Sequence, residues 1–118
     1  MERVEKLEGT TWRELVQAPV AVLVLGKSTC EACAAWTAEL EEFLAADEEW
    51  RHVRFGKILL DERGLIDFKR ANPWIAELDV LPFTQIYVAG ERSKSFAGGS
   101  IERLTKRLHN LAAERGQA

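Results

Sequence analysis

Cysteine is scarce in this sequence, with Cys30 and Cys33 the only two among 118 residues. A framework of several disulfides, of the kind that small secreted domains use, is therefore excluded. Because 47% of the residues are hydrophobic, a chain of this length can bury a core without crosslinks, and we expect residues 1–118 to form one domain. The two cysteines are therefore predicted to have a chemical role.

Long apolar runs and an excess of basic residues are also lacking. The first six residues are mostly charged, and no apolar segment behind them is long enough for a signal peptide or a transmembrane helix. Residues 31–50 carry seven acids and no Lys or Arg, whereas residues 92–115 carry six bases against two acids, and the net charge is −3. We therefore expect no nucleic-acid or membrane partner and a cytoplasmic, reducing location.

Cofactor motifs are absent as well. Neither His52 nor His109 has a ligand-like spacing to the cysteines, so we expect no metal site within the chain, although metal binding by the cysteine pairs of two chains stays open. The segment Gly26-Lys27-Ser28-Thr29 imitates the end of a phosphate-binding loop, but Ala21 stands where that motif needs its first glycine. A nucleotide site is not expected, and no cofactor is predicted.

Apolar runs that are present predict the strands of an α/β domain. Val20 to Leu25 is continuously apolar and predicts a buried strand, and further strands are expected at 53–60 and 83–88. A hairpin turn at 89–92 should lead into a last strand at 93–96.

Helical spacing of apolar residues predicts the elements between these strands. A short helix capped by Thr10 or Thr11 should end before Pro19, and a second should begin at the cysteines. Residues 66–78 look helical with one break at Asn72-Pro73, and a last helix should follow Gly98-Gly99. The apolar faces are formed by Trp36, Leu40, Phe43 and Leu44 in the second helix and by Ile101, Leu104, Leu108 and Leu111 in the last. After the short first helix, the predicted order is β-α-β-α-β-β-α.

Cys30-Glu31-Ala32-Cys33 lies at the junction of the buried strand and the second helix. A spacing of three residues on a helix brings two thiols close enough to form a disulfide. The amide groups at a helix N-terminus stabilise a thiolate, which is the form that attacks disulfides. The pattern therefore predicts a redox centre.

Three separated features together resemble the thioredoxin-like family. They are the Cys30-x-x-Cys33 pair after a buried strand, Leu81-Pro82 at a strand start, which is similar to the cis-proline loop of that family, and Phe96-Ala97-Gly98-Gly99 between the final hairpin and the last helix, which matches the glycine of the family there. The resemblance implies a thioredoxin-like fold in which helices flank a central mixed β-sheet. It also implies thiol-disulfide oxidoreductase activity, with Cys30 as the nucleophile and Cys33 as the resolving thiol.

The resemblance also implies where a substrate would bind. A cis Pro82 would expose the Leu81 backbone to an extended substrate segment, with Leu81 and Phe83 on either side of an apolar groove. Thr29 stands where the family usually has tryptophan and joins this group of substrate-facing residues. The expected partners are a disulfide-containing protein or small thiol substrate and an electron donor such as a reductase or a low-molecular-weight thiol.

Several positions depart from the family pattern. Glu31-Ala32 replaces the usual Gly-Pro, and Val24 stands where the family commonly has a buried acid, whereas Lys57 matches the lysine that accompanies this acid. These departures predict that the redox properties of the cysteine pair are tuned by Glu31, Ala32 and Lys57. Two interpretations of Glu31 stay open: it closes a capping box with Ser28, or it lies beside Cys30 and raises the pKa of that thiol.

The predicted function is the reduction of protein or small-molecule disulfides. The alternative is a non-enzymatic, thioredoxin-like redox-sensing or protein-binding module, which the missing tryptophan and acid favour. A third hypothesis is that the two cysteines serve only as packing residues and have no redox role.

Overall fold

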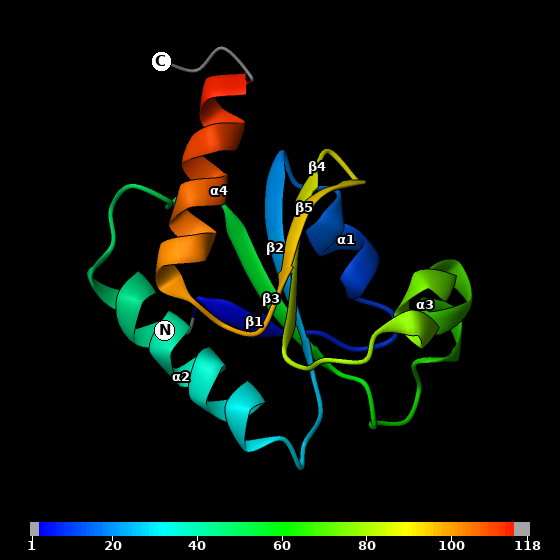
Figure 1. The fold of residues 1–118 in the computed structure, drawn as a ribbon. Coiled ribbons are helices and arrows are strands. Elements are labelled where there is room, and N and C mark those ends of the chain that lie inside the picture. The colour runs from blue at the N-terminus through cyan, green and yellow to red at the C-terminus, as the bar shows by residue number, and fades with distance from the viewer. Residues whose placement is uncertain (1–2, 115–118) are drawn as a thin grey trace.

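A five-stranded mixed sheet forms the centre of the computed structural model, which describes residues 3–114 (Figure 1). The strand order is β1-β3-β2-β4-β5. Strands β1 and β2 run parallel to β3, whereas β4 runs antiparallel to β2 and β5. The strands are β1 (Val4–Lys6), β2 (Val20–Gly26), β3 (Arg54–Leu59), β4 (Phe83–Val88) and β5 (Glu91–Ala97). The predicted class, a central mixed sheet flanked by helices, is confirmed.

Helices cover both faces of this sheet. Helices α2 and α4 pack on one face and α1 and α3 on the other, which gives three layers (Figure 1). The helices are α1 (Trp12–Val16), α2 (Glu31–Ala46), α3 (Ile66–Ala71), the 3-10 helix η1 (Pro73–Glu77) and α4 (Ile101–Glu114). The break predicted at Asn72-Pro73 is confirmed, because Pro73 begins η1 directly after α3 has ended. Among the described residues, no helix is long and apolar enough to cross a bilayer.

Strand β2 lies between β3 and β4 and is buried along its whole length. Val20, Val22 and Val24 pack in the core beneath α2 and α4. The alternate residues, Ala21, Leu23 and Leu25, pack in the core on the side of α1 and α3. Because both faces of β2 are covered, its sequence is continuously apolar rather than alternating.

Three details differ from the sequence predictions. Strand β1 was not expected, because it is a three-residue edge strand in a charged segment where only Val4 is fully buried. The last hairpin is tighter than predicted: Ala89 and Gly90 have positive φ angles, and β5 begins at Glu91. Thr11 does precede α1, but its hydroxyl accepts a hydrogen bond from the Glu8 amide instead of capping the helix.

Candidate functional site

The cysteine pair lies where β2 leads into α2 and forms a disulfide. Cys30 is the N-cap residue of α2, and Cys33 lies in its first turn with a Cα–Cα distance of 5.2 Å between them. Cys30 is half-buried, whereas Cys33 is only 4% exposed. The outer sulfur can therefore be reached from solvent, and the inner one is covered.

The Sγ of Cys30 takes the place that a capping oxygen usually has. It accepts a hydrogen bond from the backbone N–H of Cys33 at 3.1 Å. The amide groups in the first turn of α2 therefore point toward the outer sulfur, and the helix dipole favours negative charge at the same position. This geometry can stabilise a Cys30 thiolate when the disulfide is reduced.

Ser28 does not form the capping box that the sequence suggested. Its N–H donates to Asp61 at 3.0 Å, and its hydroxyl also donates to that carboxylate. The hydrogen bond from the Ser28 hydroxyl, and to a smaller extent the one from the Ser28 amide, lowers the pKa of Asp61. Within residues 3–114 the Glu31 side chain makes no hydrogen bond and is exposed. The capping interpretation was wrong because Asp61, at the end of β3, offers Ser28 a charged acceptor, and Ser28 lies two residues before the true N-cap.

Gly26 allows β2 to pass directly beneath the pair. A Cβ atom at Gly26 would lie 2.9 Å from the Cβ and 3.0 Å from the Sγ of Cys33, which is closer than side-chain carbons approach one another. The buried position of Cys33 therefore depends on a glycine at the end of β2.

The Leu81–Pro82 peptide bond is cis, as the resemblance implied. Phe83 begins β4 opposite Leu25 of β2, so Pro82 lies at the same end of the sheet as the cysteine pair. The Pro82 carbonyl accepts a hydrogen bond from Gly98 at 2.7 Å, which ties this loop to the segment before α4. Leu81 and Phe83 are half-buried, and Thr29 is exposed.

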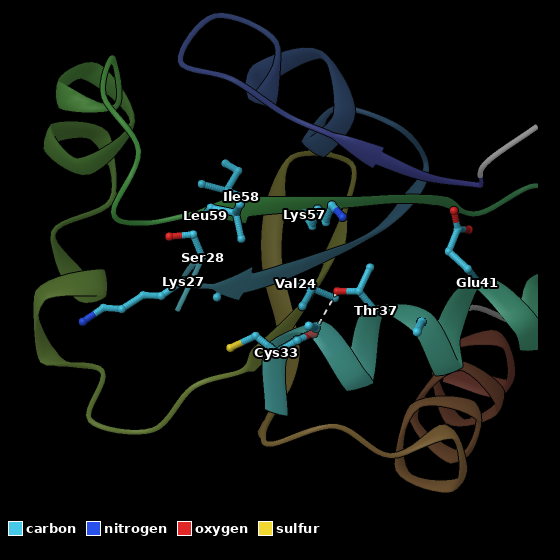
Figure 2. Close-up of a pocket in the computed structure, with 12 residues that line it drawn as sticks. Val24, Lys27, Ser28, Cys33, Thr37, Glu41, Lys57, Ile58 and Leu59 are labelled. Carbon is cyan, nitrogen blue, oxygen red and sulfur yellow. Dashed lines mark hydrogen bonds between the residues drawn. The ribbon is translucent and has the colours of Figure 1, made fainter. Parts of the chain in front are cut away.

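A pocket of about 420 Å³ lies between the first half of α2 and the ends of β2 and β3 (Figure 2). Val24 and Lys57 are register partners, so their side chains emerge on the same face of the sheet, and both line this pocket together with Cys33. Figure 2 shows Val24 between Cys33 on α2 and Lys57 on β3. The lining is completed by Gly26, Lys27, Ser28, Ala34, Thr37, Ala38, Glu41, Ile58 and Leu59.

Lys57 is half-buried and forms no ion pair within residues 3–114. Glu41 on the same pocket wall uses one carboxylate oxygen to accept hydrogen bonds from the amides of Arg3 and Val4, each at 3.0 Å. The structure therefore brings Cys33 and Lys57 to one pocket, with the apolar Val24 between them.

A second pocket, of about 540 Å³, lies on the other side of the loop before Cys30. Leu81 lines it, whereas Phe83 packs against Trp74 with ring centroids 6.0 Å apart. The structure thus brings Leu81 but not Phe83 to this hollow. Its other lining residues are Lys27, Leu60, Asp61, Lys69, Ile75, Ala76, Leu78 and Asp79.

Sequence reasoning missed Asp61 and Gly26. Asp61 lies two residues after β3, and the end of that strand lies beside the end of β2 in a parallel pair, so a carboxylate at this position was a usable signal. Gly26 was considered only as part of a phosphate-loop imitation. A glycine between an apolar strand and a cysteine pair is a signal for close packing. Trp36, one turn after Cys33 in α2, packs edge-to-face on Phe96 and donates to Thr84 at 3.2 Å.

Comparisons with known proteins point to one fold. No protein-family model matches the sequence, and no curated protein matches it. Thioredoxin f from spinach chloroplast is 18% identical, with a TM-score of 0.73 over 92% of this chain and 85% of that chain. Thioredoxin O2 from Arabidopsis thaliana is 16% identical, with a TM-score of 0.71 over 93% of this chain and 95% of that one. Mitochondrial thioredoxin 3 from Saccharomyces cerevisiae is 20% identical, with a TM-score of 0.69 over 91% of this chain and 94% of that one. This chain therefore has the thioredoxin fold, with a Cys-x-x-Cys disulfide where its central strand leads into α2.

Proposed function

We propose that this protein is a thiol-disulfide oxidoreductase that reduces protein or small-molecule disulfides through the Cys30/Cys33 dithiol. One observation carries the proposal: a half-buried Cys30 at the N-cap of α2 is joined to a buried Cys33 in a single disulfide. The thioredoxin fold around this pair supports the same activity.

The reaction follows from the positions of the two sulfurs. The Cys30 thiolate attacks one sulfur of the substrate disulfide, which forms a mixed disulfide and releases the other substrate sulfur as a thiolate that takes up a proton. The Cys33 thiol then loses its proton and attacks the Sγ of Cys30. This step breaks the intermolecular bond, releases the second substrate thiol and leaves the Cys30–Cys33 disulfide. Two electrons have then passed from the protein to the substrate, and a donor must restore the dithiol.

The substrate segment is proposed to contact Thr29, Leu81, Pro82 and Phe83. Thr29 is exposed, Leu81 and Phe83 are half-buried, and the cis peptide at the buried Pro82 lies at the same end of the sheet as the pair. The pocket that Leu81 lines offers a hollow beside the loop before Cys30, with both apolar and charged side chains on its wall. An extended segment could bind here by hydrogen bonds between backbones.

Tuning of the pair is assigned to Glu31, Ala32 and Lys57. The exposed Glu31 carboxylate follows Cys30 directly, so its negative charge opposes thiolate formation there. Ala32 leaves the helix start free of the proline that the family usually has at this position. Lys57 lies opposite Val24 in the sheet register and, like Lys27, places a cation on the pocket that Cys33 shares with Val24.

The reducing direction rests on a proposed cytoplasmic location, where small thiols and reductases keep cysteines reduced. In that setting the electron donor would be a reductase or a low-molecular-weight thiol, and the activity would contribute to redox homeostasis. The substrate would be a protein disulfide or a small disulfide.

Two serine variants test the assigned roles on a model protein disulfide. With excess dithiol, Cys30→Ser should abolish turnover, because the outer nucleophile is lost. Cys33→Ser that has been reduced beforehand and freed of dithiol should accumulate a covalent mixed disulfide through Cys30 when the substrate is added, visible as an added mass under non-reducing conditions. Retained turnover in Cys30→Ser would show that the nucleophile is assigned wrongly.

The redox midpoint of the pair decides the direction. The protein is equilibrated in graded dithiol buffers, its free thiols are trapped and its mass is measured. A reversible two-electron transition below about −230 mV supports a reductase, whereas a midpoint near about −120 mV indicates an oxidant. The absence of any transition contradicts the redox assignment.

A sensing or binding module is the second candidate function, and Val24 is the observation that favours it. An apolar side chain, 2% exposed, stands in the pocket behind Cys33, so no carboxylate at this position can take the proton of the inner thiol. A sensor needs only one oxidation per signal, and slow resolution would not harm it. Many turnovers per protein molecule exclude this candidate, whereas a single turnover supports it.

A further inference from the structure

A polar hollow of about 440 Å³ lies between the edge strand β5 and helix α4. It is away from the cysteine pair, which lies at the start of α2, at the opposite end of the molecule from the second half of α4 (Figure 1). Five polar residues line it: Lys94 and Ser95 from β5, and Lys106, Arg107 and Asn110 from α4. The cysteine chemistry does not use this hollow.

Its cations are only partly neutralised. Lys94 forms an ion pair with Glu114 at 2.9 Å, and the Lys94 side chain is 29% exposed. Arg107 donates one N–H to the Arg103 carbonyl at 3.2 Å, which removes none of its charge. Within residues 3–114 neither Lys106 nor Arg107 forms an ion pair. The hollow therefore has two positive charges that no carboxylate of the described chain balances.

The orientation of Arg107 is fixed by packing. Its guanidinium lies over the Phe96 ring, 4.9 Å from the centroid, and Phe96 is buried in the core beneath α4. A stacked guanidinium loses less freedom when it binds an anion, because its plane is already set. Beside it, the amide of Asn110 makes no hydrogen bond within residues 3–114 and so remains able to bind a ligand. Ser95 borders the hollow through its backbone, because Lys94 and Phe96 on either side of it face α4 and its own side chain points to the other face of β5.

We propose that this hollow binds the phosphate group of a small solute. Three cationic side chains and one amide converge on it from two elements, and a tetrahedral oxyanion has enough acceptor oxygens to use several of these donors at once. A small solute fits better than a nucleic acid or an acidic protein surface, because the chain has a net charge of −3 and the neighbouring helix α2 is rich in acids. The site is independent of the proposed oxidoreductase activity.

Titration with inorganic phosphate tests the proposal. Binding is measured from the backbone amide signals of the whole chain in NMR spectra. Chloride at matched ionic strength separates binding from screening. We expect saturable shifts confined to residues 94–95 and 106–110. The double variant Lys106→Gln/Arg107→Gln should bind phosphate more than about tenfold more weakly, because two charge-assisted contacts are lost.

The matched control is Arg63→Gln/Arg70→Gln, which removes the same charge from exposed arginines elsewhere and should bind as the unchanged protein does. Circular dichroism spectra of both double variants check that they are folded. Equal weakening in the two variants, or shifts spread over all basic residues, would overturn the proposal in favour of general charge. Binding to phosphatidylglycerol vesicles without a saturable response to inorganic phosphate would overturn it as well.

Discussion

Val24 is the residue that most sets this site apart from the family pattern. Its side chain packs in the core beneath α2 and faces the pocket shared by Cys33 and Lys57. A valine there costs nothing in desolvation, whereas a carboxylate would have to be buried. The chain thereby gains core stability and gives up a group that could exchange a proton with the inner thiol. Proton exchange at the inner thiol must then use water or another group of the 420 Å³ pocket.

Val24→Asp is predicted to change the pH dependence of the resolving step. Burial raises the pKa of the introduced carboxyl, so it can accept the Cys33 proton near neutral pH. The measurement is the rate at which the mixed disulfide resolves, followed between pH 5 and pH 9.

Val24→Asn is the control for this variant, because it has the same shape and polarity without a titrating group. Both variants should be less stable by about 1–3 kcal/mol, since each buries a polar group. A rate profile that is the same in Val24→Asp and Val24→Asn would show that position 24 does not exchange protons with Cys33.

At the residue scale, the sequence allowed the chemistry of the site to be predicted better than its supports. The spacing of Cys30 and Cys33 and the position of Pro82 each have a local signature, and the structure shows the disulfide and the cis bond. The contact of Ser28 with Asp61 joins residues 33 positions apart. Helix-capping rules consider only neighbours in sequence, and so they assigned Ser28 to the wrong partner.

At the scale of elements, the loop between β2 and α2 is held from outside by the end of β3. The Asp61 carboxylate accepts hydrogen bonds from both the amide and the hydroxyl of Ser28. The Leu60 amide donates a hydrogen bond to the Gly26 carbonyl at 2.7 Å. These bonds fix both ends of a short segment that leads to Cys30. The position of the outer sulfur therefore depends on β3 as well as on α2.

Asp61→Asn is predicted to destabilise the protein at neutral pH but not in acid. Because hydrogen bonds from Ser28 lower the pKa of Asp61 in the folded state, its contribution is fully present above the ordinary value of 3.8. That contribution is lost as the pH falls through the lower folded-state pKa. The melting temperatures of the two proteins should thus differ at pH 7 and converge in acid, once the pH has fallen below the lowered folded-state pKa of Asp61.

Asp79→Asn is the matched control, because Asp79 is also exposed near this loop but accepts no hydrogen bond within residues 3–114. Its melting temperature should follow that of the unchanged protein at every pH. A difference between Asp61→Asn and the unchanged protein that persists undiminished in strong acid would contradict the role given to the ionised carboxylate.

The bounds of β2 and the start of α2 were predicted to within one residue, whereas β1 was not predicted at all. β2 and α2 have long apolar runs or faces that bury many side chains. β1 is held instead by distant groups. The Glu41 carboxylate of α2 accepts hydrogen bonds from the amides of Arg3 and Val4, and the three residues of β1 pair with β3. No pattern within residues 4–6 encodes these contacts.

For the whole molecule, two apolar clusters lie on opposite faces of one sheet. The first holds Leu40 with the side chains of α2 and α4, and the second holds Leu15 with those of α1 and α3. Alternate residues of β2 belong to different clusters, so neither can lose its packing without disturbing the same strands. We propose on this basis that residues 1–118 form one domain.

The proposal predicts that both clusters unfold together in urea. Leu40→Ala and Leu15→Ala each truncate a fully buried side chain, and each should cost about 2–5 kcal/mol of unfolding free energy. In both variants the far-ultraviolet signal of the backbone and the near-ultraviolet signal of the tryptophans should give one coincident transition, because β2 couples the two faces. If Leu15→Ala instead lost its tertiary signal at a lower urea concentration than its backbone signal, the face of α1 and α3 would unfold separately. The cysteine pair would then be supported by the α2 face alone, since Cys33 and Val24 lie on that side of the sheet.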